Sequence, residues 1–265
     1  MLTILQQIIL GIVQGITEWI PISSSAALVF LLSNFYGITN FNDLIITSLF
    51  FHLGTFFAAL IYFKKDVADL TRSLFNYKYV DETKKRTIKF LFFSTIISAA
   101  VGIVILKTLA SFDALEFTGK TISIFIGILL LFTGIIQFKA RNHGLKRERN
   151  LKIKDGLLLG VAQGLAVLPG ISRSGITIST LLLKKYDDTT ALRLSFLMSL
   201  PIVLIGNIVL NFKDLVFSGT ALYGLVATFV FGILTIHLLM NVSKKINFGW
   251  FVIIFAFLMM FSVLI

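Results

Sequence analysis

The sequence predicts an all-α polytopic membrane protein, arranged as an inverted repeat in which each half has one re-entrant helix–break–helix hairpin and three transmembrane helices. Three observations lead to this prediction. Of the 265 residues, 57% are hydrophobic and only 14% are charged, whereas soluble domains have about 25% charged residues. Two apolar hairpins are interrupted by Gly, Pro and Ser, and the Lys and Arg residues lie mostly in loops between apolar runs. We expect a single membrane domain over residues 1–265.

The first repeat half, residues 1–140, is expected to begin with a broken hairpin at residues 2–32. The stretch QGITEWIPISSS at residues 14–25 interrupts it, and neither apolar arm has the roughly 20 residues that a membrane-spanning helix needs. We therefore expect this hairpin to enter and leave the bilayer on one side. Transmembrane helices are expected at residues 44–63, 88–106 and 121–138, with a charged loop at residues 64–86.

The second repeat half, residues 156–265, follows a basic loop at residues 139–155. It begins with a broken hairpin at residues 156–183, centred on PGISRSG, and helices are expected at residues 191–210, 221–240 and 248–265. The loops at 64–86 and 139–155 hold seven Lys or Arg residues each, so the positive-inside rule places both in the cytoplasm. Each half then crosses the membrane an odd number of times, which gives the halves opposite orientations. The first hairpin is expected to open from the outside and the second from the cytoplasm.

A direct comparison of the two hairpins supports the repeat. When residues 11–27 are placed over residues 160–176, six of the seventeen positions are identical. The identical pairs are Gly11/Gly160, Gln14/Gln163, Gly15/Gly164, Ile22/Ile171, Ser23/Ser172 and Ser25/Ser174. Inverted repeats with broken helices are typical of transporters, whose binding sites lie where the breaks meet. The alternative is that both hairpins are kinked spans whose Ser residues only bond to neighbouring helices.

Glu18 and Arg173 are the only charged residues well inside the two apolar hairpins. Because burial of either charge alone is costly, we expect the two to lie together or to share a polar ligand. The Gly, Pro and Ser residues of the breaks provide free backbone N–H groups and hydroxyls, which suit a phosphate or pyrophosphate head group. In a hydrolysis, Ser24 or a water would be the nucleophile, Glu18 the base or a metal ligand, and Arg173 the charge clamp. The alternative is a structural ion pair that locks the hairpins together.

Several other classes of protein are excluded by composition. The chain has no cysteine, so neither disulfides nor thiol chemistry are available. It has no P-loop and no basic domain with interleaved aromatic residues, so nucleic acid is not an expected partner. The N-terminal segment MLTILQQIIL lacks a basic region and a small-residue cleavage site, and we do not interpret it as a removable signal peptide.

The motifs QGITEWIPISSS and PGISRSGIT, with HLGTFFAALIYF between them and LSFLMSLP after them, resemble the undecaprenyl-diphosphate phosphatase family, also called the bacitracin-resistance protein family. The resemblance covers almost the whole chain. It implies a multi-pass phosphatase of the plasma membrane that converts a polyprenyl diphosphate to the monophosphate, so that the lipid carrier of envelope glycans is recycled. It also implies a divalent cation, Mg²⁺ or Ca²⁺. The expected partners are the polyprenyl diphosphate and membrane lipids, and a homodimer is a further candidate assembly.

The resemblance carries roles onto individual positions of this chain. Gln14 and Glu18 match the two acidic positions of the family's (E/Q)xxxE motif, and Glu18 is the expected metal contact. The expected catalytic residues are Glu18, Ser24 as the nucleophile, and Arg173. The expected substrate-binding residues are Gln14, Ser23, Ser25, His52, Ser172, Ser174, Gly175 and Thr177.

One departure from the family pattern concerns the reaction itself. The family's PxSSTGH motif ends in Gly-His, whereas this chain has Ala26 and Ala27 at those positions. The His is commonly given an acid/base role, and loss of a positioned acid/base typically costs about 10²–10⁴ in rate. Three outcomes follow: Glu18 suffices with a metal-activated water, His52 substitutes for the missing His, or hydrolysis is lost. In the last case the chain would be a non-hydrolytic translocase or binder of polyprenyl phosphate on the same fold.

Overall fold

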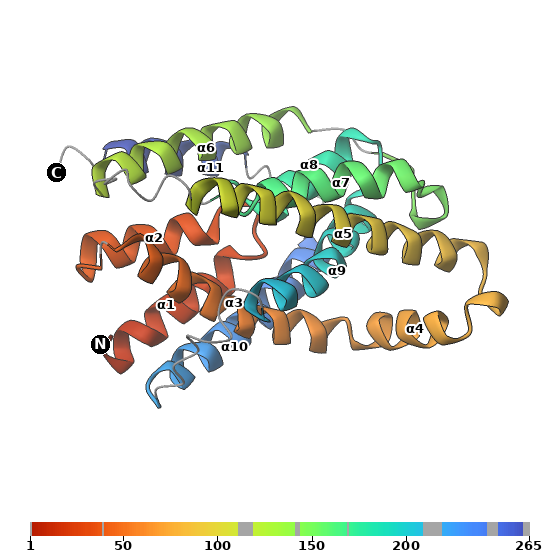
Figure 1. Ribbon diagram of the computed structural model, residues 1–265, viewed down its shortest axis with the longest axis horizontal. Helices are drawn as coiled ribbons and strands as arrows, with labels where there is room; N and C mark the ends of the chain where they lie inside the picture. The colour runs from red at the N-terminus through yellow and green to blue at the C-terminus, as the bar shows by residue number, and fades with distance from the viewer. Residues whose placement is uncertain are drawn as a thin grey trace.

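The computed structural model describes residues 2–38, 40–110, 119–140, 144–168, 170–208, 219–242 and 249–261. All the secondary-structure elements in these ranges are helices. The only β-type pairing described is an isolated bridge between Lys146 and Tyr186. The α-helices are α1 Ile4–Thr17, α2 Ser24–Phe35, α3 Phe41–Tyr62, α4 Lys64–Phe75, α5 Glu82–Ala110, α6 Gly119–Lys139, α7 Ile153–Leu165, α8 Arg173–Leu183, α9 Asp188–Gly206, α10 Ala221–Val242 and α11 Gly249–Phe261. Two short 3₁₀ helices, η1 Tyr77–Tyr79 and η2 Glu148–Asn150, lie in the loops. The assembly is shown in Figure 1.

Three of the described helices are long and apolar enough to cross a membrane, at Glu82–Thr108, Asp188–Gly206 and Ala221–Asn241. A fourth span is obtained if Ile46–Tyr62 and Lys64–Phe75 are counted together, although the chain bends by 78° between them. The prediction of an all-helical, multi-pass membrane protein is therefore confirmed. The ends of the helices expected at 191–210 and 248–265, and Pro169 of the second break, lie outside the described residues.

The segment 64–86 was expected to be a charged loop, and that prediction is wrong in part. It contains α4, η1 and the first turns of α5. α4 forms because its sequence is amphipathic: Val67 and Leu70 pack against the main hydrophobic core, while Lys65 and Arg72 remain exposed. In Figure 1, α4 and the start of α5 lie at the opposite end of the assembly from the N-terminus.

Both predicted hairpins consist of two short helices separated by a break. The first break separates α1 from α2, and the second separates α7 from α8. α2 and α8 begin in the same way, because Ser23 and Ser172 are their N-caps and accept hydrogen bonds from the backbone N–H groups of Ala26 and Gly175. A Ser N-cap satisfies one of the donors that a helix start leaves free.

Glycines allow two pairs of helices to approach closely. A Cβ atom at Gly15 of α1 would lie 2.7 Å from the carbonyl oxygen of Thr228 in α10, and one at Gly160 of α7 would lie 2.9 Å from that of Ser94 in α5. Small residues at such crossings let helix backbones pack tightly in membranes. α1 therefore lies along α10 and α7 along α5, while α6 lies along α11.

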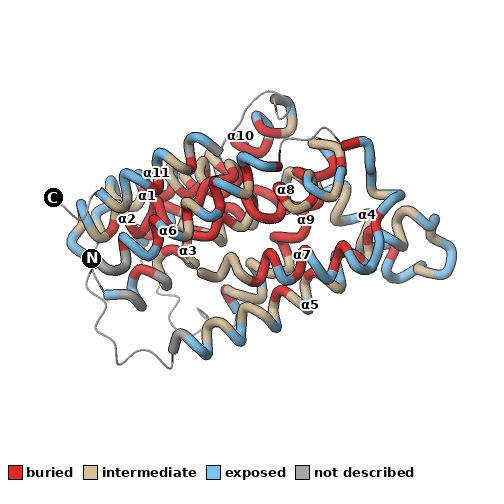
Figure 2. Tube along the Cα trace, turned by 90° about the horizontal axis from the view of Figure 1, so that it is seen from above, coloured by how far each residue is buried: buried red, intermediate tan, exposed pale blue. Residues whose placement is uncertain are grey.

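Many polar side chains of the long helices are buried, and apolar side chains cover much of the outside. Ser94, Ser98 and Thr228 are buried, whereas Phe92 and Leu238 are exposed on the long helices. Figure 2 shows that most buried residues lie in the middle of the assembly. This distribution is expected where lipid, rather than water, surrounds the helices.

Candidate active site

The two breaks meet and are joined by hydrogen bonds. The backbone N–H of Gly170 donates to Ser23 Oγ over 3.3 Å, and Ser174 Oγ donates to the carbonyl oxygen of Ile20 over 3.2 Å. Gln137 of α6 donates from Nε2 to the carbonyl oxygen of Pro21. These contacts hold a small pocket between the breaks, with a cavity volume of about 40 Å³. Its lining residues are Glu18, Ile22, Ser23, Ser24, Ser25, His52, Ala166, Ile171, Ser172, Arg173 and Ser174.

Glu18 lies at the centre of the polar contacts in this pocket and is buried. Its Oε2 accepts hydrogen bonds from Ser24 Oγ at 2.5 Å and from Gln14 Nε2 at 3.0 Å, and it lies 3.1 Å from His52 Nε2. Its Oε1 forms an ion pair with Nη2 of Arg173. Gln14 reaches Glu18 because it lies four residues earlier, one turn back along α1. Four side chains, from α1, α2, α3 and α8, thus converge on one carboxylate.

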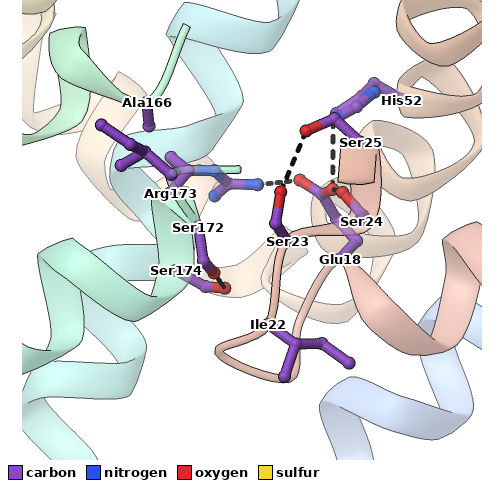
Figure 3. A pocket seen from close by; sticks show the side chains of 11 residues that line it. Glu18, Ile22, Ser23, Ser24, Ser25, His52, Ala166, Ser172, Arg173 and Ser174 are labelled. Carbon is purple, nitrogen blue, oxygen red and sulfur yellow. Dashed lines mark hydrogen bonds and ion pairs between the residues drawn. The ribbon is translucent and has the colours of Figure 1, made fainter. Parts of the chain in front are cut away.

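Arg173 is the first residue of α8 and faces Glu18 across the pocket (Figure 3). Its Nη2 is taken by Glu18, whereas its Nη1 is buried without a hydrogen-bond partner among the described residues. Its guanidinium carbon also lies 5.6 Å from the ring centre of Trp19. A buried guanidinium nitrogen without a partner is costly, so Nη1 is suited to bind an anion that enters the pocket.

The N-terminal ends of α2 and α8 both lie at the pocket. Ser24 and Arg173 are the first residues of these helices, and both line the pocket. Helix N-termini have free backbone N–H groups and a partial positive charge, and both features favour phosphate. Two hydroxyl pairs lie beside them, Ser23 with Ser25 at 3.1 Å and Ser172 with Ser174 at 3.3 Å.

His52 of α3 brings an imidazole into the pocket. Its Nδ1 lies 2.7 Å from the carbonyl oxygen of Ser48, and its Nε2 faces Glu18. A carbonyl and a carboxylate are both acceptors, so only the doubly protonated ring can donate to both. Ala27, at the position of the family His, is buried in α2 and does not line the pocket.

Three residues that the sequence predicted to bind substrate lie outside the pocket lining. Gln14 donates to Glu18, and the backbone N–H of Gly175 donates to Ser172, the N-cap of α8. Thr177 Oγ1 lies 2.6 Å from Ser195 Oγ and donates to the carbonyl oxygen of Arg173. Their direct contact with substrate stays a prediction. Sequence reasoning also missed Trp19 and Gln137. The signal for Gln137 was an amide inside the apolar run at 121–138, where polar residues are rarely found without a function.

The side chains of the pocket indicate how the expected divalent cation could be bound. Among the described residues, no three Asp, Glu, His or Cys side chains are grouped so that they could hold a metal ion, and Glu18 is the one carboxylate of the pocket. Mg²⁺ is commonly held by one or two carboxylates together with substrate phosphates and water. The residues therefore fit a cation that arrives with a diphosphate and contacts Glu18, and not a site made only of protein ligands.

Comparison with known proteins identifies the family. The sequence model of the bacitracin resistance protein BacA matches residues 7–261. The chain belongs to the BacA family. It is 41% identical over 258 residues to an undecaprenyl-diphosphatase of Methanococcoides burtonii, and the match covers 96% of each chain. An undecaprenyl-diphosphatase of Saccharolobus islandicus is 37% identical over 243 residues, with 86% of this chain and 84% of the relative covered. One from Methanothrix thermoacetophila is 32% identical over 254 residues, with 94% and 93% covered.

The BacA match includes both breaks and thus every residue of the pocket. The resemblance inferred from the motifs of the two breaks is therefore confirmed. It also places the Glu18–Arg173 pair in a family whose curated relatives are named as phosphatases.

Proposed function

We propose that this chain is an integral membrane phosphatase that hydrolyses a polyprenyl diphosphate of the undecaprenyl type to the monophosphate. The observation that carries the proposal is Arg173, whose Nη1 has no partner among the described residues and which lies beside a Ser24–Glu18 hydrogen bond of 2.5 Å. The curated relatives named undecaprenyl-diphosphatase support the same substrate class. The reaction releases inorganic phosphate and returns the lipid monophosphate for reuse as a carrier.

The pocket binds the head group, and the polyprenyl chain stays in the bilayer. The terminal phosphate binds Arg173 Nη1 and the N–H groups at the starts of α2 and α8. Because the phosphate competes for Arg173, the Glu18–Arg173 ion pair loosens and Glu18 becomes a stronger base.

Ser24 attacks the terminal phosphorus while Glu18 accepts the proton of its hydroxyl. The bond from that phosphorus to the bridging oxygen breaks, and its electron pair leaves with the polyprenyl monophosphate. His52 donates a proton to the leaving oxygen and is reprotonated by Glu18, with which it is already in contact. Water then cleaves the phosphoserine, regenerates the hydroxyl and releases phosphate. Arg173 stabilises the negative charge on the transferring group throughout.

A divalent cation bound with the diphosphate would neutralise part of the phosphate charge. Glu18 would be its protein ligand. The rest of the proposed chemistry depends on the side chains of the pocket.

We also propose that the fold is an inverted repeat with two re-entrant hairpins, over repeat halves 1–140 and 156–265. Equivalent helices of the proposed halves make equivalent contacts, because α1 packs on α10 and α7 packs on α5. Ser23 and Ser172, which are aligned in the sequence comparison, are both N-caps. Within this proposal the chain is a single-domain protein located in the plasma membrane, and a homodimer is a candidate assembly.

The test is phosphate release from undecaprenyl diphosphate by the purified protein in detergent, with Mg²⁺ or Ca²⁺. Arg173→Ala is expected to lower kcat/KM by at least about 10², which is typical for the loss of one charge-stabilising donor. Ser24→Ala is expected to reduce release to near background, whereas Thr71→Ala on the exposed side of α4 serves as a control and leaves it unchanged. Absence of release by the wild type, over several cations and lipid lengths, would overturn the phosphatase. Movement of labelled polyprenyl phosphate across liposomes would then indicate the translocase.

A further inference from the structure

Trp19 follows Glu18 in the chain and lies against the other charged residue of the pocket. It is only 1% exposed, and the guanidinium carbon of Arg173 lies 5.6 Å from its ring centre. Its ring also makes an edge contact with Phe196 of α9, with 4.9 Å between ring centres and an interplanar angle of 72°. A guanidinium over an aromatic face is attracted by the electrons of the ring, and tryptophan is the strongest partner for it.

Arg173 therefore has two kinds of contact with the protein. Nη2 forms the ion pair with Glu18, and the guanidinium lies near the indole of Trp19. If a phosphate takes Nη2 from Glu18, only the indole continues to hold the guanidinium from the protein side. An arginine side chain has many rotamers, so without such a contact it would lose its orientation when the ion pair opens.

We propose that Trp19 is a positioning residue, whose indole holds the guanidinium of Arg173 while the phosphate of the substrate displaces Glu18. The inference rests on the proposed function for the identity of the ligand. It assigns Trp19 no contact with the reacting atoms. Its effect is on how often Arg173 is in the geometry that binds phosphate, and therefore on KM more than on kcat.

The indole N–H of Trp19 does not contribute a hydrogen bond to the described residues, so the aromatic face is the part of the side chain that acts on Arg173. Nε1 of Trp19 is buried and has no hydrogen-bond partner among the described residues. Trp19→Phe therefore keeps an aromatic face and removes no hydrogen bond. Trp19→Leu keeps an apolar side chain but removes the aromatic face. These two variants separate the contact with Arg173 from simple filling of the core.

The kinetic test uses the full-length purified protein and undecaprenyl diphosphate. Trp19→Leu is expected to raise KM at least tenfold, while Trp19→Phe stays within about threefold of wild type. Phe196→Leu removes the edge contact on Trp19 and no contact with Arg173, and it is expected to leave KM within the same limit. A wild-type KM in Trp19→Leu would overturn the proposal, as would equal losses in Trp19→Leu and Trp19→Phe. The thermal midpoint of each variant shows that it is folded.

A second test does not require hydrolysis. The chain has two tryptophans, and Trp250 is 59% exposed on α11 outside the pocket lining. In a Trp250→Phe background, the emission of Trp19 alone is followed during titration with inorganic pyrophosphate. A saturable change that disappears in Arg173→Ala supports the proposal even if the wild type releases no phosphate from the lipid. Unchanged emission overturns it even if the wild type is an active phosphatase.

Discussion

The carboxylate of Glu18 contacts four side chains, and each of them affects its reactivity in a different way. Ser24 donates to it, His52 and Arg173 give it positive neighbours, and Gln14 fixes its orientation from the preceding turn. A carboxylate with these contacts is a weak base until a ligand draws a cation away. The same residue therefore offsets part of the positive charge of His52 and Arg173, and it becomes reactive only when the ligand binds.

The first prediction concerns the charge of Glu18. Glu18→Gln keeps the size of the side chain but removes the proton acceptor and leaves Arg173 without its counter-charge. We expect kcat/KM for phosphate release to fall by about 10²–10⁴, the usual effect of losing a general base. Gln14→Leu serves as a control because it removes one contact of Glu18 and no charge, and its loss should be smaller. A Glu18→Gln variant with wild-type activity would contradict the assigned role.

The second prediction concerns the imidazole. If His52 supplies the proton that Ala27 cannot, His52→Gln should lower kcat by about 10²–10⁴ with a much smaller change in KM. Ala27→His in the His52→Gln background should restore part of the loss by returning an imidazole to the family position. Phosphate release at saturating lipid measures both variants. Full activity of His52→Gln would show that Glu18 works without an imidazole.

At the scale of the helices, the position of the first break was predicted more accurately than its length. The stretch at residues 14–25 was expected to interrupt the first hairpin, but α1 continues to Thr17 and only residues 18–23 lie between the helices. The reason is that Gln14 bonds to Glu18 along the helix and does not interrupt it. Similarly, α5 is longer than the expected 88–106. Its first turns are polar, so a boundary drawn from hydropathy leaves them out. Hydropathy locates the part of a helix that lies in lipid, whereas capping and side-chain contacts decide where the helix ends.

The third prediction concerns the crossing of α1 and α10. A methyl group at Gly15 would meet the Thr228 carbonyl oxygen at 2.7 Å and the Gly232 nitrogen at 2.9 Å. Gly15→Ala is therefore expected to destabilise the protein by about 1–3 kcal/mol through overpacking.

Gly102 in α5 provides the matched control, since a methyl group there meets nothing within 4 Å. Gly102→Ala should be neutral or stabilising by up to about 1 kcal/mol, because alanine favours helix. Thermal unfolding in detergent measures both variants. Equal midpoints for the two would show that the α1–α10 crossing tolerates a larger residue.

At the scale of the whole molecule, the meeting of the two breaks could be predicted from the cost of burying charge. That cost predicted that Glu18 and Arg173 lie together or share a polar ligand, and in the structure they form an ion pair. The contacts of His52 and Trp19 could not be predicted in this way. Both depend on how α3, α8 and α9 are rotated about their axes, and apolar periodicity around a buried helix does not determine that rotation.

The fourth prediction concerns the orientation of the molecule in the membrane. Because the chain has no cysteine, single cysteines can be introduced without a background. Asn34→Cys near the end of α2 should react with a membrane-impermeant maleimide in intact cells, whereas Lys65→Cys in α4 should react only after permeabilisation. Both residues are exposed. The reason is that the positive-inside rule predicts a cytoplasmic position for the basic segment with Lys65. Reaction of both variants from the same side would contradict the proposed topology.

The ion pair between Glu18 and Arg173 sets a threshold on the charge of a ligand. A ligand that separates Glu18 from Arg173 must itself attract the guanidinium as strongly as the carboxylate did. A group with several negative oxygens does this more easily than a group with few. The diphosphate head group therefore meets the threshold more easily than the monophosphate that remains after cleavage. When the monophosphate is left in the pocket, the carboxylate competes successfully for the guanidinium and closes the pair again. The same ion pair thus also favours product release, and the exchange moves nothing larger than two side chains.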